Sequence, residues 1–537
     1  MRSRNRILGV ALASTLLAMA PVSHASITAP VKTKDGLVSG TPGKIEGVTA
    51  FKGIPFAAPP VGDLRWRAPQ PVKAWKGVRD GSKYSKACMQ APGGNRVNPT
   101  TDMPDSPGVS EDCLYLNVWT AASKAGEKRP VMVWLYGGAY NEGGGNSPFS
   151  EGDPLAKKGV VLVTLNYRNG AFGFLSHPEL TKESGHNASG NYALMDAIAA
   201  LKWIKANIAQ FGGDPNNVTV FGESAGACMS AALVGSPMAK GLINRAISES
   251  GAWMGLGIAK MMPREAAEAA TLKQAEAAGA TSLAALRAMP ADEVMKKIRG
   301  QGMIVDGWVI PEDLSKTFAQ GRQNKVDVLV GSNGEEGSFT AGRGPAMTAA
   351  LWRTGASQRW GTLADKGLAA YPAATDAEAK DIAAVPFSDT LAWHMRLYAD
   401  LQAKTGANAY LYHFTHRPPY DPDKPNLGSA HTAEIPYVFD NLAAPRTFPG
   451  QSSVKLMAGN PTEEAFADEI SSYWVNFART GDPNGPGLPK WPKVNELGPN
   501  EVMILDAGKS GRGPWLTAAK ADLFQSIYDR DVKPVTQ

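Results

Sequence analysis

The sequence of 537 residues contains little cysteine and histidine, with three of the first and seven of the second. It has no H-E-x-x-H segment and no cluster of cysteine and histidine, so it offers none of the common metal-binding patterns. A G-x-x-x-x-G-K-[ST] segment is also missing, which argues against a phosphate-binding loop. We therefore expect neither a metal nor a cofactor.

The sequence also has no large excess of either positive or negative charge. Lysine and arginine total 55 against 50 aspartate and glutamate, for a net charge of +5. No block of basic residues with interleaved aromatic residues is present, so nucleic acid is not expected as a partner. The composition is that of an ordinary globular protein, without a fixed-period repeat.

The N-terminal segment has the pattern of a secretory signal peptide. Arg2, Arg4 and Arg6 precede an apolar run at residues 7–20, and a small-x-small cleavage site ends at Ala25. The run is shorter than the roughly 20 residues that a spanning helix needs, and no later apolar stretch is long enough to span a membrane either. We expect removal of residues 1–25, which would lower the net charge from +5 to +2. Residues 26–537 would then form an exported chain without a membrane span.

The three cysteines are expected to differ in state. Cys88 and Cys113 lie in a loop-rich region and could close a stabilising loop in an oxidising compartment. Cys228 falls on a segment of small residues typical of a helix, where a buried free thiol is the simpler interpretation.

Alternating strand and helix patterns predict a doubly wound α/β fold. Apolar runs near residues 131–136, 159–168, 218–221 and 326–330 are typical of strands in a mostly parallel sheet. Residues 191–213 have helical spacing and end at two glycines. Ala-rich stretches at 258–300 and 345–406 predict helical insertions above the carboxyl edge of the sheet. We expect residues 26–537 to form one domain.

Residues 218–230, "VTVFGESAGACMS", place Ser224 between Gly222 and Gly226 where a strand meets a helix. This is the pattern of a nucleophile elbow, G-x-S-x-G, although an ordinary glycine-rich loop could contain the same residues. An elbow serine would require a base, an acid and oxyanion donors, in the chain order Ser, acid, His.

The candidate base is His431. It lies in a loop of small residues, "LGSAHTAEIPYVF", after the last predicted strands. His416 is the alternative, but it adjoins Arg417 and two prolines at the end of a strand.

The candidate acids are Glu335 and Glu336, which follow the strand at 326–330, although a pair of solvated carboxylates would look the same. Two consecutive turn residues cannot both face His431. One of the two is therefore expected to face His431, and the other to face solvent with little effect on activity. The glycine-rich segment "LYGGAYNEGGG" at 135–145 fits an oxyanion loop.

Taken together, the sequence resembles the type-B carboxylesterase and cholinesterase family of the α/β-hydrolase fold, most closely its bacterial para-nitrobenzyl esterase-like members. The resemblance covers nearly all of residues 26–537. It is carried by "FKGIPFAAPPVGDLRWRAPQP", "EDCLYLNVW", "NYRNGAFGFL", "FGGDPNNVTVFGESAGA", "NGEEGSF" and "GSAHTAEIPYVF". It implies Ser224 as nucleophile, Glu336 as acid and His431 as base, and an oxyanion hole formed by the N–H groups of Gly138, Ala139 and Ala225.

The same resemblance implies several supporting residues. It pairs Cys88 with Cys113, and it implies the ion pairs Arg65–Glu111 and Arg168–Asp196. Glu223 and Ser250 match positions that support the triad, and Trp253 lies near the acyl pocket. Ala139 replaces the family's more common third glycine, which would narrow the pocket slightly.

Three functions remain open on these grounds. The first is a secreted serine carboxylesterase that acts on a small-molecule ester through an acyl-enzyme. The second is an esterase for bulky aromatic esters, such as feruloyl esters, with Tyr140, Trp253 and Trp308 lining the pocket; plain packing would explain the same aromatics. The third is a non-catalytic binding protein of this family, which retention of the three triad residues disfavours.

Overall fold

A computed structural model describes residues 26–93, 98, 100–103, 105–340, 346–445 and 452–533. The expected signal peptide, residues 1–25, lies outside these ranges. Within them, no helix combines the length and the apolar character that crossing a membrane requires.

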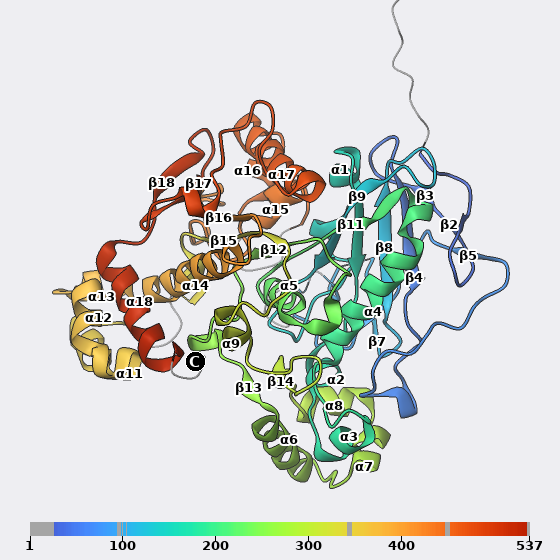
Figure 1. Ribbon diagram of the computed structural model, residues 1–537, viewed down its shortest axis with the longest axis horizontal. Coiled ribbons are helices and arrows are strands. Elements are labelled where there is room, and N and C mark those ends of the chain that lie inside the picture. The colour runs from blue at the N-terminus through green and yellow to red at the C-terminus, as the bar shows by residue number, and fades with distance from the viewer. Residues whose placement is uncertain are drawn as a thin grey trace, which may run out of the picture.

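The centre of the described structure is an 11-stranded sheet with strand order β18-β17-β16-β15-β12-β11-β9-β10-β8-β4-β3 (Figure 1). Its strands are β3 (Thr41–Pro42), β4 (Thr49–Pro55), β8 (Tyr115–Thr120), β9 (Arg129–Leu135), β10 (Val161–Leu165), β11 (Gly213–Glu223), β12 (Arg245–Glu249), β15 (Asp327–Asn333), β16 (Ala409–Phe414), β17 (Glu501–Leu505) and β18 (Gly511–Pro514). Small sheets join β1 (Val31–Lys32), β2 (Leu37–Ser39) and β5 (Val78–Asp80), then β6 (Ala87–Cys88) with β7 (Val109–Ser110), and β13 (Met262–Pro263) with β14 (Ile304–Val305).

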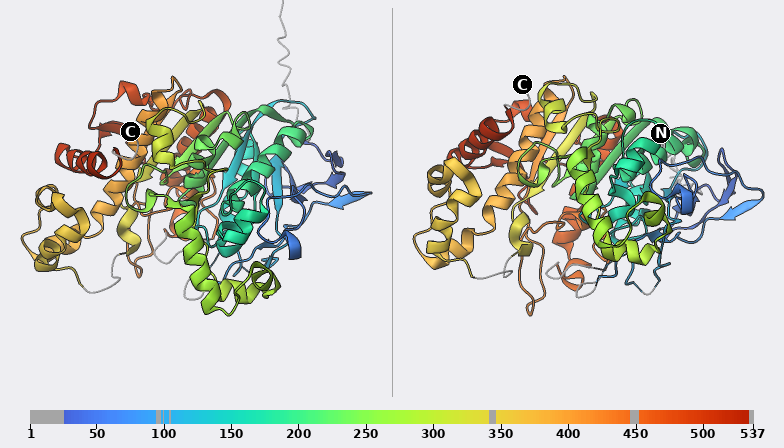
Figure 2. Two further views of the ribbon diagram at one scale, coloured as in Figure 1. Left: turned by 60° about the horizontal axis from the view of Figure 1, so that its bottom comes forward. Right: turned by 90° about the horizontal axis from the view of Figure 1, so that it is seen from below.

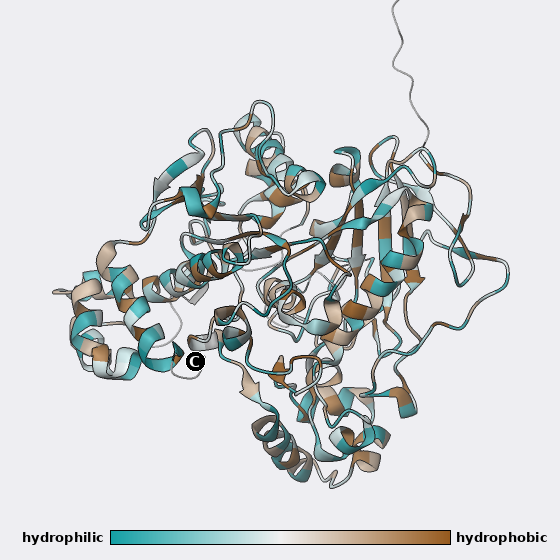
Figure 3. Ribbon diagram, viewed as in Figure 1, coloured by the Kyte–Doolittle hydropathy of each residue, from teal (hydrophilic) through white to brown (hydrophobic). Residues whose placement is uncertain are grey.

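The middle of the sheet is parallel, from β10 through β9, β11, β12, β15 and β16 to β17. Antiparallel strands β8, β4, β3 and β18 complete its two ends. Every residue of β10 is buried, and so is all of β9 after Arg129. Continuous apolar strands of this kind are what two covered faces require, and Figure 3 shows the hydrophobic colour concentrated along these central strands.

Helices cover both faces of the sheet, as a doubly wound fold requires. In Figure 1, α4, α5 and α14 lie below the sheet, and α1 and α15 to α17 lie above it. Their bounds are α1 (Asp153–Lys157), α2 (Gly170–Phe174), α3 (Pro178–Glu183), α4 (Tyr192–Asn207), α5 (Ala225–Gly235), α9 (Leu314–Ala319), α14 (Val385–Ala403), α15 (Ile435–Val438), α16 (Val454–Met457) and α17 (Pro461–Thr480). The predicted helix at 191–213 is therefore shorter than expected, because a 3-10 turn at Ile208–Phe211 leads into β11 at Gly213.

Helical insertions follow the carboxyl ends of β12 and β15 as expected, but the second is shorter than the predicted 345–406, because residues 385–403 form α14, which packs on β15 and β16. The first consists of α6 (Arg264–Ala277), α7 (Leu283–Ala288) and α8 (Ala291–Lys297). The second consists of α10 (Ala349–Thr354), α11 (Ala356–Trp360), α12 (Ala364–Ala370) and α13 (Asp376–Ile382), which pack with α18 (Ala518–Asp531). Figure 2 shows both groups outside the sheet. The second group has its own apolar core, which includes Trp352, Trp360 and Phe524.

Cys88 and Cys113 form a disulfide, and Cys228 is a free thiol. The bond links β6 to the segment that enters β8, on the antiparallel side of the sheet. Cys228 is half-buried and packs against the main apolar core, so the expected free core thiol is confirmed, although its burial is only partial. Its thiol approaches the carbonyl of Ala252.

Replacing both Cys88 and Cys113 with serine should lower the free energy of unfolding by about 3 kcal/mol, because the bond closes a loop with a sequence separation of 25. Chemical denaturation of the two forms measures the difference. Peptide mass spectrometry without reductant should find this cross-link alone, and a cross-link that includes Cys228 would contradict the pairing.

Candidate active site

Ser224 occupies a strained turn between β11 and α5. Its backbone angles are φ 56° and ψ −121°, a conformation that non-glycine residues rarely adopt. The flanking glycines are required because a Cβ at Gly226 would lie 1.9 Å from the carbonyl oxygen of Leu135, and one at Gly222 would lie 2.4 Å from it. The elbow predicted from the sequence is therefore present, with Ser224 half-buried at its tip.

The glycine-rich loop after β9 packs directly against this turn. A Cβ at Gly137 would lie 2.8 Å from a carboxylate oxygen of Glu223 and 3.2 Å from Cβ of Ser224. Ala139 has φ 51°, so the loop, like the elbow, contains a strained non-glycine residue. Among the described residues, none accepts a hydrogen bond from the N–H of Gly138 or Ala139. Ala225 begins α5, so its N–H has no partner within the helix.

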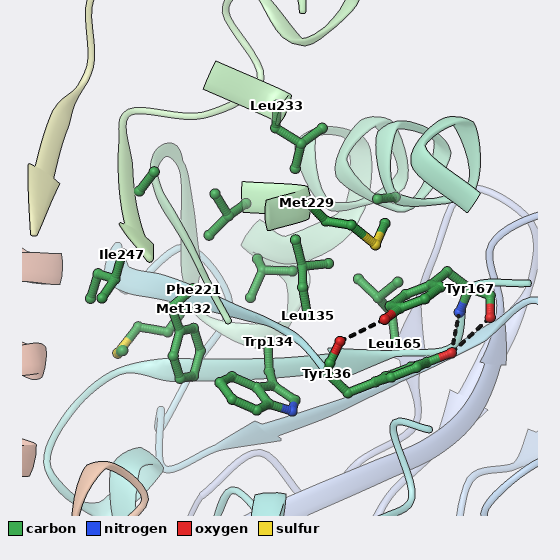
Figure 4. Packing of buried hydrophobic residues seen from close by; sticks show 14 of the residues in the cluster. Met132, Trp134, Leu135, Tyr136, Leu165, Tyr167, Phe221, Met229, Leu233 and Ile247 are labelled. Carbon is green, nitrogen blue, oxygen red and sulfur yellow. Dashed lines mark hydrogen bonds between the residues drawn. The ribbon is translucent and has the colours of Figure 1, made fainter. Parts of the chain in front are cut away.

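A pair of tyrosines holds the start of this loop in place. The rings of Tyr136 and Tyr167 stack with centroids 4.0 Å apart. Each hydroxyl donates to the other residue's carbonyl, at 2.7 Å from Tyr136 and 2.6 Å from Tyr167 (Figure 4). Tyr136 and Tyr167 follow β9 and β10, so their two hydrogen bonds fix the carboxyl ends of two adjacent strands beside the elbow.

His431 and Glu336 are in direct contact. The ring Nδ1 of His431 lies 2.6 Å from Oε2 of Glu336, whose side chain is fully buried. The other carboxylate oxygen of Glu336 accepts from the backbone N–H of Asn333 at 2.7 Å and from the hydroxyl of Ser250. Ser250, at the end of β12, also has a positive φ of 62°. Both oxygens of the Glu336 carboxylate are therefore occupied as acceptors.

The second ring nitrogen of His431 faces the elbow. Nε2 lies 3.1 Å from Oε1 of Glu223, the residue immediately before Ser224. Burial acts to lower the pKa of His431, but the carboxylates of Glu223 and Glu336 outweigh it and raise this pKa. Burial in turn raises the pKa of Glu223. The imidazole is therefore held between two carboxylates that favour its charged form.

Replacing Glu223 with glutamine should move the acid limb of the kcat/KM profile to lower pH. The substitution removes a negative charge beside Nε2, so the pKa of His431 falls and the neutral base persists in more acidic solution. A pH–rate series on both forms measures the shift. An unchanged limb, or one displaced to higher pH, would contradict this electrostatic role.

Two further residues of this cluster, Asn333 and Glu434, were not predicted from the sequence. Asn333 donates through its side chain to the carbonyl of Ala430 at 2.8 Å and to Glu434 at 2.5 Å. Glu434 is 1% exposed, and burial raises its pKa, with the charge of Glu336 acting in the same direction. One sequence feature could have indicated Glu434: it follows the candidate base His431 by three residues, within a run of small and apolar residues.

The three aromatic candidates lie in different surroundings. Tyr140 packs on Phe174 at 5.1 Å between ring centroids and contacts Cys228. Trp253 is 4% exposed and donates from Nε1 to the carbonyl of Cys228. Trp308 stacks on the exposed ring of His186 at 3.8 Å. Tyr140 and Trp253 thus both contact Cys228 on α5. The stacking of Trp308 on His186 does not link Trp308 to these two aromatic residues.

The remaining candidates lie in other networks. His416, the alternative base, contacts Glu463 at 3.0 Å and Asp506 at 3.3 Å. Two ion pairs implied by the resemblance are confirmed, Arg65–Glu111 at 2.5 Å and Arg168–Asp196 at 2.7 Å. The expectation that Glu335 simply faces solvent is wrong, because its carboxylate binds Arg417 and Ser429.

A mostly parallel sheet with helices on both faces, a strained serine where a strand meets a helix, and a histidine paired with a buried glutamate beside that serine define an α/β hydrolase. The carboxylesterase family model matches residues 28–521, and the chain belongs to this family. It is a carboxylic ester hydrolase.

Curated relatives and solved structures agree with this assignment. The chain is 38% identical to the fumonisin B1 esterase of Sphingopyxis macrogoltabida, over 91% of this chain and 88% of the relative. It is 35% identical to the para-nitrobenzyl esterase of Bacillus subtilis (strain 168), over 89% and 94% of the two chains. The crystal structure of the Geobacillus stearothermophilus carboxylesterase EST55 superposes with a TM-score of 0.75 at 32% identity and covers 92% of this chain and 100% of that one.

Proposed function

We propose that the protein hydrolyses carboxylic esters through an acyl-enzyme on Ser224, with His431 as general base and acid and Glu336 as the orienting carboxylate. The proposal rests on the placement of the His431 ring. Its Nδ1 pairs with Glu336, and its Nε2 faces Glu223, the residue directly before Ser224. Glu223 and Ser250 support this arrangement from either side.

The reaction proceeds in two halves. His431 takes the proton of Ser224 through Nε2 while the serine oxygen attacks the ester carbonyl, and Glu336 stabilises the imidazolium through Nδ1. The tetrahedral intermediate collapses, the bond to the alcohol oxygen breaks, and His431 gives its proton to the leaving alkoxide. Water then attacks the acyl-enzyme by the same steps, which releases the acid and restores the serine.

The N–H groups of Gly138, Ala139 and Ala225 are proposed to bind the oxyanion. Gly138 and Ala139 lie in the loop that contacts the elbow, and Ala225 is the first residue of α5. Donors held in place before the reaction stabilise developing charge without reorganisation. A helix N-terminus adds a favourable field for an anion.

Steady-state and rapid-mixing assays with a chromogenic short-chain ester test this function. We expect turnover with an initial burst of about one chromophore per enzyme if deacylation is the slower half. An ester panel that varies acyl and alcohol size separately would define the preference. Fumonisin B1 belongs in that panel because of the 38% identical relative, and feruloyl esters test the aromatic-ester alternative. Absence of turnover on every ester would favour a binding protein instead.

We also propose that residues 1–25 direct export and that residues 26–537 act as one catalytic domain. The Cys88–Cys113 bond supports an oxidising destination. The family match over residues 28–521 supports a single domain. N-terminal sequencing of the exported protein should give Ser26 as the first residue.

A further inference from the structure

We propose that Glu335 is a positioning residue that holds the backbone before His431, so that two adjacent glutamates hold the catalytic histidine from two sides. This inference rests on the proposed role of His431. Glu336 contacts the imidazole itself, and Glu335 contacts the chain that carries it.

The carboxylate of Glu335 is bound to the segment at 428–430 by several contacts. Its Oε2 accepts from the backbone N–H of Ser429 at 2.6 Å and from the Ser429 hydroxyl at 3.1 Å. Its own backbone N–H donates to the carbonyl of Ser429 at 3.0 Å. A bridge between Glu335 and Ala430 extends this pairing to the residue directly before His431.

Arg417 completes the network from the end of β16. It donates to Glu335 from Nε at 3.2 Å and from its terminal nitrogen. The side chain of Arg417 is 67% exposed and that of Glu335 32%, so the ion pair alone contributes little free energy. The hydrogen bonds to Ser429 are therefore the main link between Glu335 and the histidine loop.

Gly428 shows how closely the carboxylate lies against this loop. The residue has φ +67°, and a Cβ there would lie 1.8 Å from Oε2 of Glu335. Tyr420 donates to the carbonyl of Gly428 at 2.7 Å and adds a further hydrogen bond to this segment. A side chain at position 428 would therefore displace the carboxylate of Glu335.

The contacts of Glu335 affect catalysis through the position of the His431 ring. Glu335 and Glu336 follow β15 in one turn, and β15 is a central strand of the sheet. The turn therefore fixes the distance between the acceptor for Nδ1 and the backbone that leads to the ring. Misplacement of a catalytic group by about 1 Å can cost about 10²-fold in rate.

Glu335→Ala should lower kcat by about tenfold or more with little change in KM, because the base is misplaced and substrate contacts are kept. Glu335→Gln retains one acceptor for the Ser429 N–H and should recover part of the loss. The matched control is Glu501→Ala. Glu501 also accepts from a backbone N–H, that of Gly498 at 2.6 Å, and pairs with exposed Arg512, but it joins β17 to β18.

A second variant keeps the test valid if Glu335→Ala is poorly stable. Gly428→Ala should reduce kcat in the wild-type background and have a smaller further effect on kcat in the Glu335→Ala background, where the carboxylate it displaces is gone. The inference is overturned if Glu335→Ala matches Glu501→Ala in kcat, or if both Glu335 variants change only thermal unfolding. If Ser224→Ala retains activity, the proposed function fails instead, and the two failures are thereby separated.

Discussion

Replacing Ser224 with alanine should abolish ester hydrolysis, with kcat falling by about 10⁶-fold, as when a serine nucleophile is removed from a comparable triad. The hydroxyl is lost from the tip of the elbow, where the substitution leaves a small side chain that fits the same turn. Thermal unfolding should therefore be unchanged. The measurement is kcat on a chromogenic ester with purified protein.

A matched control is available on the same helix. Ser230 lies on α5, is fully buried, and its hydroxyl has no hydrogen-bond partner among the described residues, so Ser230→Ala should retain kcat. Turnover by folded Ser224→Ala at the wild-type rate would show that another group attacks the ester, and the acyl-enzyme mechanism would be wrong.

Replacing Glu336 with glutamine should lower kcat by about 10⁴-fold with a modest change in KM. Both oxygens of Glu336 are acceptors, one for His431 Nδ1 and the other for Asn333 N–H and Ser250. A glutamine has one acceptor oxygen, so its NH₂ group must face a donor on one of these sides. The imidazole then loses its orientation and the charge that stabilises its protonated form.

Glu335, the residue directly before Glu336, provides the matched comparison. We now expect Glu335→Gln to lose some activity through the loop contacts, yet far less than Glu336→Gln. If the larger loss fell on Glu335→Gln, the assignment of the acid would be wrong, although membership of the family would stand.

The sheet and the elbow could be predicted because their signals are local, whereas the pairing of Glu336 with His431, 95 residues apart, was expected only from the resemblance to the family. Residues 218–226 contain the whole pattern of strand, turn and helix start, and the crowding at Gly222 and Gly226 explains why that pattern is specific. The order of acid and base then follows from the fold.

The contacts of Glu335 could not be predicted in this way. Arg417 and Ser429 are 82 and 94 residues further along the chain, and only the pairing of β15 with β16 brings the segments together. Asn333 and Glu434 are likewise 101 residues apart and meet only in the folded chain. A single sequence contains no local pattern for contacts of this range.

The most direct test of the account is to locate the covalent intermediate. The wild-type protein is treated with a fluorophosphonate ester, and the modified peptide is identified by mass spectrometry. The account predicts one phosphonyl group per chain, attached to Ser224, with parallel loss of ester hydrolysis and much slower labelling of His431→Ala. Inactivation with the label on any other residue would contradict it.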